Sequence, residues 1–506
     1  MGYTPRLSSA FNNTRLRSSH ISPQSGMCSF CTEDCEGSCE IALAAVLGAR
    51  TVYPTNTGNN QIASEKDYPV DFSHFNINGR VFGANGAKAS YEEANIYKVK
   101  LEREYGSRNR VKLALPVILP ALIKLDWQDY FGGAAMAGVS AVIGESARDK
   151  DPELKIEGGK IVRFPALKTM LDAFRKYYRG YGQIILQCNV EDDMLGLPEY
   201  AIKEYGLEAL EFKFGQGAKG TQPARKLKNR QDALQKRAQG NMVFPNPEDE
   251  EIARLDKEGC APNFYSYDRL PLWTEDYLFS RISRLRELGL KNVYFKMAGF
   301  DPQDLKRVLE IASKAEVDMV SFDGAGGGSG YSPNRMMNEW GLPTILLEDR
   351  VCQLTKKMEQ EGKRLPAITI TGGFSSEDQV FKSLAYGDGR VAAIGICRAA
   401  MTAAMMGKKI GMLVKDGATP KHFANYGATI EELFGDLPDL RAIYGKESSR
   451  FSTGAIGVFS YLNKIAFGLK HFAALNRKFD VSLLNKSDLI PLTKTAKALI
   501  EEKWFY

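Results

Sequence analysis

The chain has 506 residues, of which 44% are hydrophobic and 25% charged, and this balance is ordinary for a globular protein with a sizeable core. A formal net charge of +6 is too small for this length to favour nucleic-acid binding, although it suits an acidic protein partner or an anionic small molecule. The sequence has no apolar run of membrane-spanning length and no apolar signal segment near Met1, so we expect no membrane span. Four scattered cysteines indicate a reducing, cytoplasmic location: Cys188, Cys260, Cys352 and Cys397.

Residues 1–110 are predicted to form an N-terminal extension that carries four further cysteines close together. Cys28, Cys31, Cys35 and Cys39 have the spacing C-x2-C-x3-C-x3-C, so four thiolates can surround one metal centre. Zinc sites usually pair two C-x2-C units that lie a dozen or more residues apart. The compact spacing therefore favours a 4Fe–4S cluster, with structural zinc as the alternative.

From residue 111 onward, short apolar segments alternate with amphipathic helical stretches. Nearly continuous apolar runs are typical of parallel strands that are covered on both faces. Eight such units predict a (β/α)8 TIM barrel over residues 111–405, followed by a helical C-terminal extension over 406–506. A doubly wound sheet is the alternative. The predicted strands are Val111–Val117, Ser140–Ser146, Gln183–Asn189, Ala209–Gly215, Asn292–Ala298, Val317–Gly324, Ala367–Gly373 and Val391–Cys397.

A long insertion, residues 218–273, separates the fourth and fifth predicted strands. Its first half is basic and its second half is acidic. Long insertions at this face of a barrel are commonly lids or binding elements. We therefore expect a long loop that crosses the C-terminal face of the barrel.

The ends of the seventh and eighth strands carry glycines that indicate a phosphate site. Gly372, Gly373 and Gly395 would let backbone N–H groups approach a phosphate, and the next helix would begin after an N-cap at Ser375 or Ser376. Phosphate sites of TIM barrels occupy this place. A simple tight turn is the structural alternative for the Gly-Gly pair.

Other strand ends supply polar groups and a bare backbone. Lys296 lies within an apolar strand, and lysine is rarely buried without a partner. The segment Asp323–Gly330 holds five glycines in its last seven residues, which would let it lie against a flat ligand. Histidine is scarce, with four in the chain, and none follows these strands, so Ser-His-Asp, Cys-His and His-ligated metal chemistry are not expected.

In their order, these motifs resemble the FMN-binding synthase domain of glutamate synthase over residues 110–405. The matching stretches are GES at Gly144–Ser146, EFKFGQGAK at Glu211–Lys219, Lys296, DGAGGGSGYSP at Asp323–Pro333, TGGF at Thr371–Phe374 and GICRA at Gly395–Ala399.

The resemblance implies an FMN-binding TIM barrel, with the flavin phosphate at Gly372, Gly373 and Gly395. The flavin ring would lie near Lys296 and the glycines Gly326, Gly327 and Gly328, with Lys213, Asp323 and Arg398 as further cofactor-binding candidates. A 2-oxo acid would be held by Gln216, Lys219 and Lys296, and Glu145 is a candidate proton donor.

The implied reaction is the reductive amination of 2-oxoglutarate to L-glutamate. Electrons would pass from a ferredoxin-like donor through the cysteine-bound cluster to FMN. The sequence departs from the family because it lacks a nucleophilic cysteine after Met1 and the cluster cysteines after the eighth strand. Ammonia from glutamine would therefore need a separate glutaminase chain.

Two other functions stay open on the sequence. In the first, a flavin-dependent dehydrogenase oxidises an amine or another small acid and passes electrons out through the cluster. In the second, the chain is a non-catalytic electron-transfer subunit. Whether the chain forms a homo-oligomer is not decided by the sequence.

Overall fold

The computed structural model describes residues 68–122, 127–145, 147–214, 225–324, 340–421, 423–424 and 426–501. The predicted segments at 1–67, including Cys28, Cys31, Cys35 and Cys39, lie outside the described residues. None of the helices in the described part of the chain combines the length and apolarity that crossing a bilayer needs.

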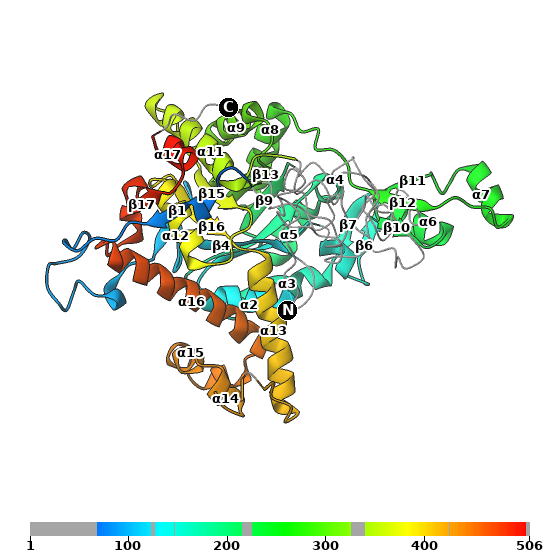
Figure 1. Cartoon of the computed structure of the whole chain (residues 1–506). Coiled ribbons are helices and arrows are strands. Elements are labelled where there is room, and N and C mark those ends of the chain that lie inside the picture. The colour runs from blue at the N-terminus through cyan, green and yellow to red at the C-terminus, as the bar shows by residue number, and fades with distance from the viewer. Residues whose placement is uncertain are drawn as a thin grey trace, which may run out of the picture.

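Eight parallel strands close into a barrel, which confirms the predicted fold (Figure 1). The strands follow one another in chain order around the barrel, and the last pairs with the first. Five of them are buried at every residue, as parallel strands covered by helices should be. The strands are β4 (Val117–Leu122), β5 (Ser140–Ile143), β8 (Ile184–Cys188), β9 (Ala209–Lys213), β13 (Asn292–Ala298), β14 (Met319–Asp323), β15 (Ala367–Thr371) and β16 (Val391–Gly395).

A helix follows each barrel strand and packs on the outside of the barrel. Several begin at well-defined caps: Asp301 accepts a hydrogen bond from the Gln303 amide, and Pro302 occupies the first helical position of α9. The helices are α2 (Trp127–Ala137), α3 (Pro165–Arg175), α4 (Val190–Met194) with α5 (Leu197–Tyr205), α8 (Glu275–Glu287), α9 (Pro302–Lys314), α11 (Thr344–Gln360), α12 (Glu377–Tyr386) and α13 (Arg398–Lys415). A small hairpin, β6 (Lys155–Glu157) and β7 (Lys160–Arg163), precedes α3.

The first barrel strand was predicted at Val111–Val117, but it lies about one strand length later in the chain. Val111–Leu113 forms β3, which pairs antiparallel with β2 (Arg103–Tyr105) in a separate hairpin. Its side chains alternate between buried and exposed, which is the pattern of a strand with one wet face. Pro116 then interrupts the apolar run, and the barrel strand β4 begins at Val117.

The β2–β3 hairpin packs against residues at the starts of the barrel strands. The Tyr105 ring lies 5.9 Å from the Tyr294 ring, and its hydroxyl is 2.9 Å from that of Ser140. Tyr294 in turn donates to Gln183 across 2.6 Å. The hairpin thus closes the N-terminal end of the barrel and leaves the C-terminal end as the open one.

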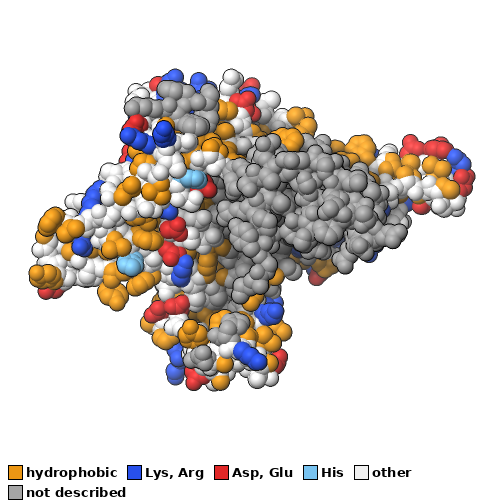
Figure 2. Space-filling model, in the orientation of Figure 1, with side chains coloured by type: hydrophobic (Ala, Val, Ile, Leu, Met, Phe, Trp, Pro, Cys, Tyr) orange, Lys and Arg blue, Asp and Glu red, His pale blue; other side chains and the backbone are white. Residues whose placement is uncertain are grey.

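The insertion before β13 is a folded lobe rather than the expected long loop. Residues 225–268 form an antiparallel sheet in the order β10 (Arg225–Leu227), β12 (Phe264–Tyr267), β11 (Met242–Phe244), with helices α6 (Arg230–Ala238) and α7 (Glu250–Lys257). This lobe has its own core of Leu227, Ala233, Val243 and Phe264. It projects from the barrel, and charged side chains gather at its α7 tip (Figures 1 and 2).

The C-terminal extension is mainly helical, as predicted. Its longest helix, α16 (Thr453–Leu475), crosses α13 closely because both helices carry glycine at the contact. A Cβ on Gly407 would lie 3.1 Å from the Gly457 Cα and 2.5 Å from the Thr453 carbonyl oxygen. The remaining elements are α14 (Ile430–Leu433), α15 (Leu437–Tyr444), β17 (Leu489–Pro491) and α17 (Lys494–Ile500).

The N-terminal segment and the C-terminal segment meet beside α12. Strand β1 (Phe75–Ile77) pairs antiparallel with β17, and the Asn78 amide donates to the Asp488 carbonyl across 2.8 Å. Lys478 and Arg80 both contact the Asp488 carboxylate, the latter at 3.3 Å. The two ends of the described chain therefore support each other against the barrel (Figure 1).

Candidate functional site

Charged side chains line the C-terminal half of the barrel interior. Lys213 and Lys296 are register partners on β9 and β13, and Asp323 is the partner of Ala298 on the next strand. Register partners on neighbouring strands face the same side of a sheet, so Lys213 and Lys296 both face the barrel interior. Residues two apart on one strand also face the same side, so Glu211 faces the interior as well. The sequence reasoning had placed Lys296, Lys213 and Asp323 at this end, and the structure brings all three together.

Lys296 is the central cation of this group. Its side chain is 4% exposed, and its Nζ lies 3.0 Å from Asp323 Oδ1. Burial works to lower the pKa of Lys296, but the neighbouring carboxylates of Asp323 and Glu211 outweigh burial, so the pKa is raised. Lys296 is therefore a fixed positive charge in a dry place.

Asp323 is held from a second side. The Thr371 hydroxyl on β15 donates a hydrogen bond to the same oxygen that faces Lys296. Because Asp323 and Thr371 are register partners, this contact follows from the strand pairing itself. The lysine, the carboxylate and the hydroxyl form a row across three adjacent strands.

Lys213 pairs with Glu145, the residue proposed as a proton donor. Glu145 follows β5 and is part-buried, and its carboxylate accepts a hydrogen bond from Lys213 Nζ. In this arrangement Glu145 is a partner of Lys213, and a role as acid would require it to leave that lysine.

Sequence reasoning missed two buried polar residues in the same interior. Glu211 accepts a hydrogen bond from Gln187 Nε2 across 2.5 Å, and both are almost fully buried. Burial raises the pKa of Glu211, and nearby Lys296 opposes that rise. The signal was present: Glu211 lies two residues before Lys213, and Gln187 interrupts the apolar strand IILQC.

The Gln187 side chain also offers an unused acceptor. Its Oε1 is buried and has no hydrogen-bond partner among the described residues. Buried polar atoms are normally satisfied, so an orphaned one in a strand interior indicates a missing ligand or water. It faces the same interior as Lys296.

The glycines at the ends of β15 and β16 have different reasons to be glycine. Gly372 and Gly373 have φ of +130° and +84°, which other residues rarely adopt. A Cβ on Gly395 would lie 2.3 Å from Thr371 Cγ2, so packing requires glycine there. Beside Gly373, no described atom lies within 4 Å of an added Cβ, so a ligand has room to approach its backbone.

The helix after the glycine pair begins as predicted, with Ser376 as its N-cap. Gln379 Oε1 accepts from the Ser375 and Ser376 amides at 2.8 and 3.2 Å. These two donors are therefore already used. A phosphate here would depend on the glycine backbone more than on the start of α12. Arg398, the first residue of α13, is exposed at the end of the neighbouring strand.

Several predicted site residues lie outside the described residues. These are the substrate candidates Gln216 and Lys219, the glycines Gly326, Gly327 and Gly328, and the four cysteines of the N-terminal extension. Within the described ranges, no group of three or more His, Cys, Asp or Glu side chains is arranged to hold a metal ion.

Comparison with known proteins gives one family match. Residues 271–408 match the model of the conserved region in glutamate synthase. This stretch includes Lys296, Asp323, the Gly372–Gly373 pair and Gly395, so the match supports the resemblance drawn from the motifs. No curated protein matches the chain.

Among solved structures, the chain is similar to forms of (S)-mandelate dehydrogenase. A mutant of an active chimera of that enzyme is 12% identical, with a TM-score of 0.44 over 83% of this chain and 88% of that one. An oxidised active mutant is 14% identical, with a TM-score of 0.43 over the same shares. A structure described as monotopic membrane protein (S)-mandelate dehydrogenase is 12% identical, with a TM-score of 0.41 over 83% of this chain and 89% of that one.

Proposed function

We propose that this protein is an FMN-dependent oxidoreductase of the glutamate synthase type. The observation that carries the proposal is the buried Lys296 at the open end of a closed barrel, beside Asp323 and Glu211 and below the glycines after β15. The family match over residues 271–408 includes Lys296, Asp323 and the glycines after β15, while Glu211 lies before it. A fixed cation in a dry interior suits a ligand that is electron-rich or anionic.

The residues present fit FMN on three counts. Gly373 has open space beside a backbone with positive φ, which suits a phosphate. Gln187 Oε1 is a buried acceptor with no partner among the described residues, and it suits an N–H group of a flat ring. Lys296 supplies the positive charge that favours a reduced, anionic ring.

When bound, FMN would supply hydride to the imine carbon of an amino-acid precursor. The protein's part is placement and charge. Lys296 would attract either the ring or the carboxylate of a 2-oxo acid, and Asp323 with Thr371 would fix the orientation of its Nζ. Lys213 and Glu145 would hold a second polar position at the same end, where a proton can be given or accepted.

The specific reaction we propose is the conversion of 2-oxoglutarate to L-glutamate, in the cytoplasm. Its electrons would come from a ferredoxin-like donor through a 4Fe–4S cluster at Cys28, Cys31, Cys35 and Cys39. Its ammonia would come from solution or from a separate glutaminase chain. The support for these parts is the sequence, namely the cysteine spacing and the motif order.

The test is an anaerobic preparation of the whole protein with iron and flavin quantitation. We expect one FMN and about four irons per chain. Reduced ferredoxin should bleach the flavin absorbance, and the addition of 2-oxoglutarate with ammonium should restore it. Zinc in place of iron would contradict the cluster but not the flavin. Reversal by no 2-oxo acid, together with flavin reduction by an amine or a hydroxy acid, would favour the dehydrogenase alternative. A protein that binds no flavin would contradict the proposal.

A further inference from the structure

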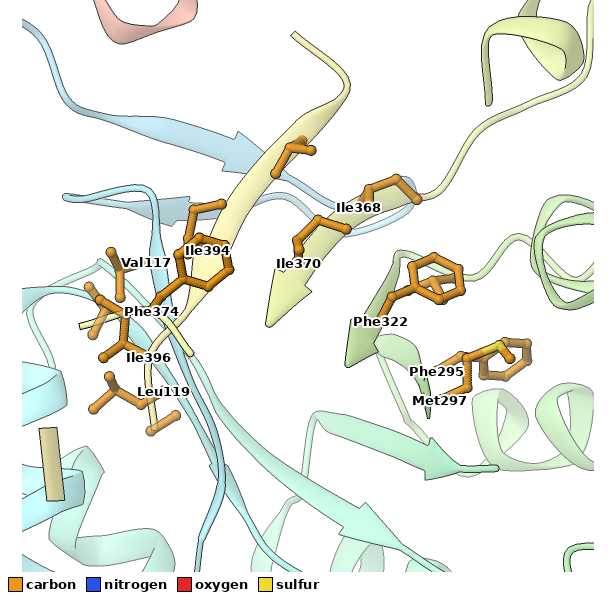
Figure 3. Packing of buried hydrophobic residues seen from close by; sticks show 14 of the residues in the cluster. Val117, Leu119, Phe295, Met297, Phe322, Ile368, Ile370, Phe374, Ile394 and Ile396 are labelled. Carbon is orange, nitrogen blue, oxygen red and sulfur yellow. The ribbon is translucent and has the colours of Figure 1, made fainter. Parts of the chain in front are cut away.

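The glycine pair after β15 is followed by a phenylalanine that anchors it to the outside of the barrel. Phe374 is buried and belongs to the same hydrophobic cluster as Ile394 and Ile396, which lie on β16 and just beyond it. Figure 3 shows Phe374 beside these side chains and Val117 of β4. Phe374 therefore packs behind the ends of both strands that carry the candidate phosphate glycines.

Phe72, from the segment before the barrel, packs on Phe374. The two ring centroids are 5.4 Å apart with the planes tilted by 41°, and Phe72 itself is 8% exposed. A contact of this kind between large buried rings contributes to both burial and geometry. It links a residue far upstream in the sequence to the loop that ends β15.

Phe72 is held in place by contacts that do not involve the loop. It begins a short 3-10 turn in which Asp71 caps the Ser73 amide across 2.7 Å. Three residues later, Phe75 packs on Tyr386 at the far end of α12, with the ring centroids 6.3 Å apart, and β1 pairs with β17. The segment is thus a fixed support, against which Phe374 rests.

The glycine pair needs such a support because its backbone has little intrinsic preference. Glycine at positive φ loses more conformational freedom on ordering than other residues do. On one side, the Thr344 hydroxyl donates to the Gly372 carbonyl across 2.9 Å. On the other side, the next anchor along the chain is Phe374. The direction in which the backbone amides of the glycine pair point therefore depends on both the Thr344 hydrogen bond and the packing of Phe374.

We propose that Phe72 is a positioning residue for the cofactor phosphate: by packing on Phe374 it fixes the Gly372–Gly373 backbone in the conformation that receives the phosphate of FMN. This inference rests on the proposed function, because FMN is the phosphate-bearing ligand that it names. The energetic basis is preorganisation, since a loop that is already ordered loses less entropy on binding. Phe72 touches neither the ring nor the phosphate.

The test compares two phenylalanines of the same segment. Phe72→Ala removes the support of the loop, while Phe75→Ala removes a similar buried ring at the other end of α12. Dissociation constants of FMN and of riboflavin, which lacks the phosphate, are measured by flavin fluorescence on the reconstituted full-length variants. We expect Phe72→Ala to weaken FMN by about tenfold or more and riboflavin little. Phe75→Ala should change the ratio of the two constants less than Phe72→Ala does, because the pairing of β1 with β17 still holds the segment and the Phe72–Phe374 contact is kept.

A conservative variant and a hydrogen-exchange measurement complete the test. Phe72→Leu, which keeps most of the apolar volume, should recover most of the FMN affinity. If Phe72→Ala does not fold, hydrogen exchange at Gly372–Phe374 decides: it should be faster in Phe72→Leu than in Phe75→Leu. An unchanged FMN-to-riboflavin ratio in folded Phe72→Ala, or equal exchange in the two leucine variants, would overturn this inference alone. A wild-type protein that binds no FMN would instead overturn the proposed function.

Discussion

At the scale of single residues, the barrel interior holds a buried ion pair, and removing either member alone should destabilise the protein. Lys296 and Asp323 are each about 4% exposed, so neither can be hydrated when its partner is lost. Breaking a buried ion pair by removing one member is strongly destabilising, because the other charge stays in a dry place.

Lys296→Met should therefore reduce the free energy of unfolding by about 3 kcal/mol or more, because the Asp323 carboxylate stays buried without this cation. The double variant Lys296→Met, Asp323→Asn should regain a large part of the loss. Urea unfolding of the four proteins of this cycle measures both effects. Lys291→Met is the control: its pair with Glu208 is half-exposed, and its loss should cost less than about 1 kcal/mol. Equal losses in the two single lysine variants would contradict the reasoning.

Glu211 should make stability depend on pH in the direction opposite to that of most carboxylates. Burial raises its pKa, so the folded protein keeps this proton at pH values where the unfolded chain has released it. The stability contributed by Glu211 is therefore present at low pH and is lost as the pH rises through the raised pKa. Glu211→Gln should remove this component, so its unfolding free energy should fall less than that of the wild type as the pH rises above the ordinary pKa of glutamate.

The check is a series of urea unfolding curves across that pH range. Glu208→Gln, at an exposed position on the same segment, is the matched control and should keep the wild-type profile. Parallel profiles for the wild type and Glu211→Gln would show that the carboxylate titrates normally.

At the scale of elements, ion pairs near the ends of the barrel strands fix the lobe of residues 225–268. Lys236 on α6 contacts Asp149 at 3.1 Å, and Arg269 contacts the buried Glu191 on α4 through its backbone amide at 2.7 Å and its side chain at 3.3 Å. Arg269 also donates to the Gly240 carbonyl inside the lobe across 2.8 Å. One arginine thus ties the lobe to the loop after β8.

Arg269→Ala should loosen the lobe without unfolding the barrel. We expect cleavage inside residues 225–268 to become several-fold faster in limited proteolysis, with the fragments identified by mass spectrometry, because local opening governs such cleavage. Arg254→Ala is the control, since Arg254 pairs with Glu251 and Glu258, which both belong to the lobe. A lobe that resists protease equally in both variants would show that its own core holds it in place.

The same elements show what could be read from the sequence. Seven barrel strands were predicted close to their true positions, because a run that is buried on both faces is apolar throughout. The first strand was misplaced because Val111–Leu113 and Val117–Leu122 form one apolar run in sequence, and only Pro116 marks the change. The lobe was missed because short, partly exposed strands such as Met242–Phe244 leave little apolar pattern.

The candidate site was likewise only partly predictable from the sequence. Lys296 and the Gly372–Gly373 pair could be singled out as candidates from the sequence, because a charge or a glycine pair contrasts with an apolar strand. Glu211 was overlooked beside Lys213, and Phe72 could not have been found, since no local pattern relates it to Phe374. Contacts between distant segments are a property of the packed chain.

At the scale of the whole molecule, the two ends of the described chain form one small sheet against α12. Strand β17 covers β1, Leu492 donates to the His74 carbonyl across 2.9 Å, and Lys486 lies over the Tyr386 ring at 4.8 Å. The N-terminal segment therefore depends on the C-terminal one for its backbone hydrogen bonds. Removing the second should release the first.

Ending the chain after Asn485 should increase hydrogen exchange at Phe75–Asn78 strongly, while the amides of β13 and β14 keep their protection. The melting temperature should fall, because buried side chains of β17 and α17 are lost together. Ending the chain after Ile500 is the control and should change little. Unchanged protection of Phe75–Asn78 in the shorter protein would mean that packing on α12 alone holds β1.

The pairing of β1 with β17 also sets the order of events during synthesis. The paired residues are roughly four hundred positions apart, and a ribosome adding about 5–20 residues per second needs on the order of half a minute to cover that distance. Through that interval the upstream strand has no partner, and the support behind Phe374 is incomplete. All eight barrel strands precede β17 in the chain, so the barrel can form before β17 is made, whereas the support behind Phe374 is complete only once β17 pairs with β1. If Phe72 positions the phosphate loop as proposed, FMN binding should reach full affinity only after β17 has been made and has paired with β1.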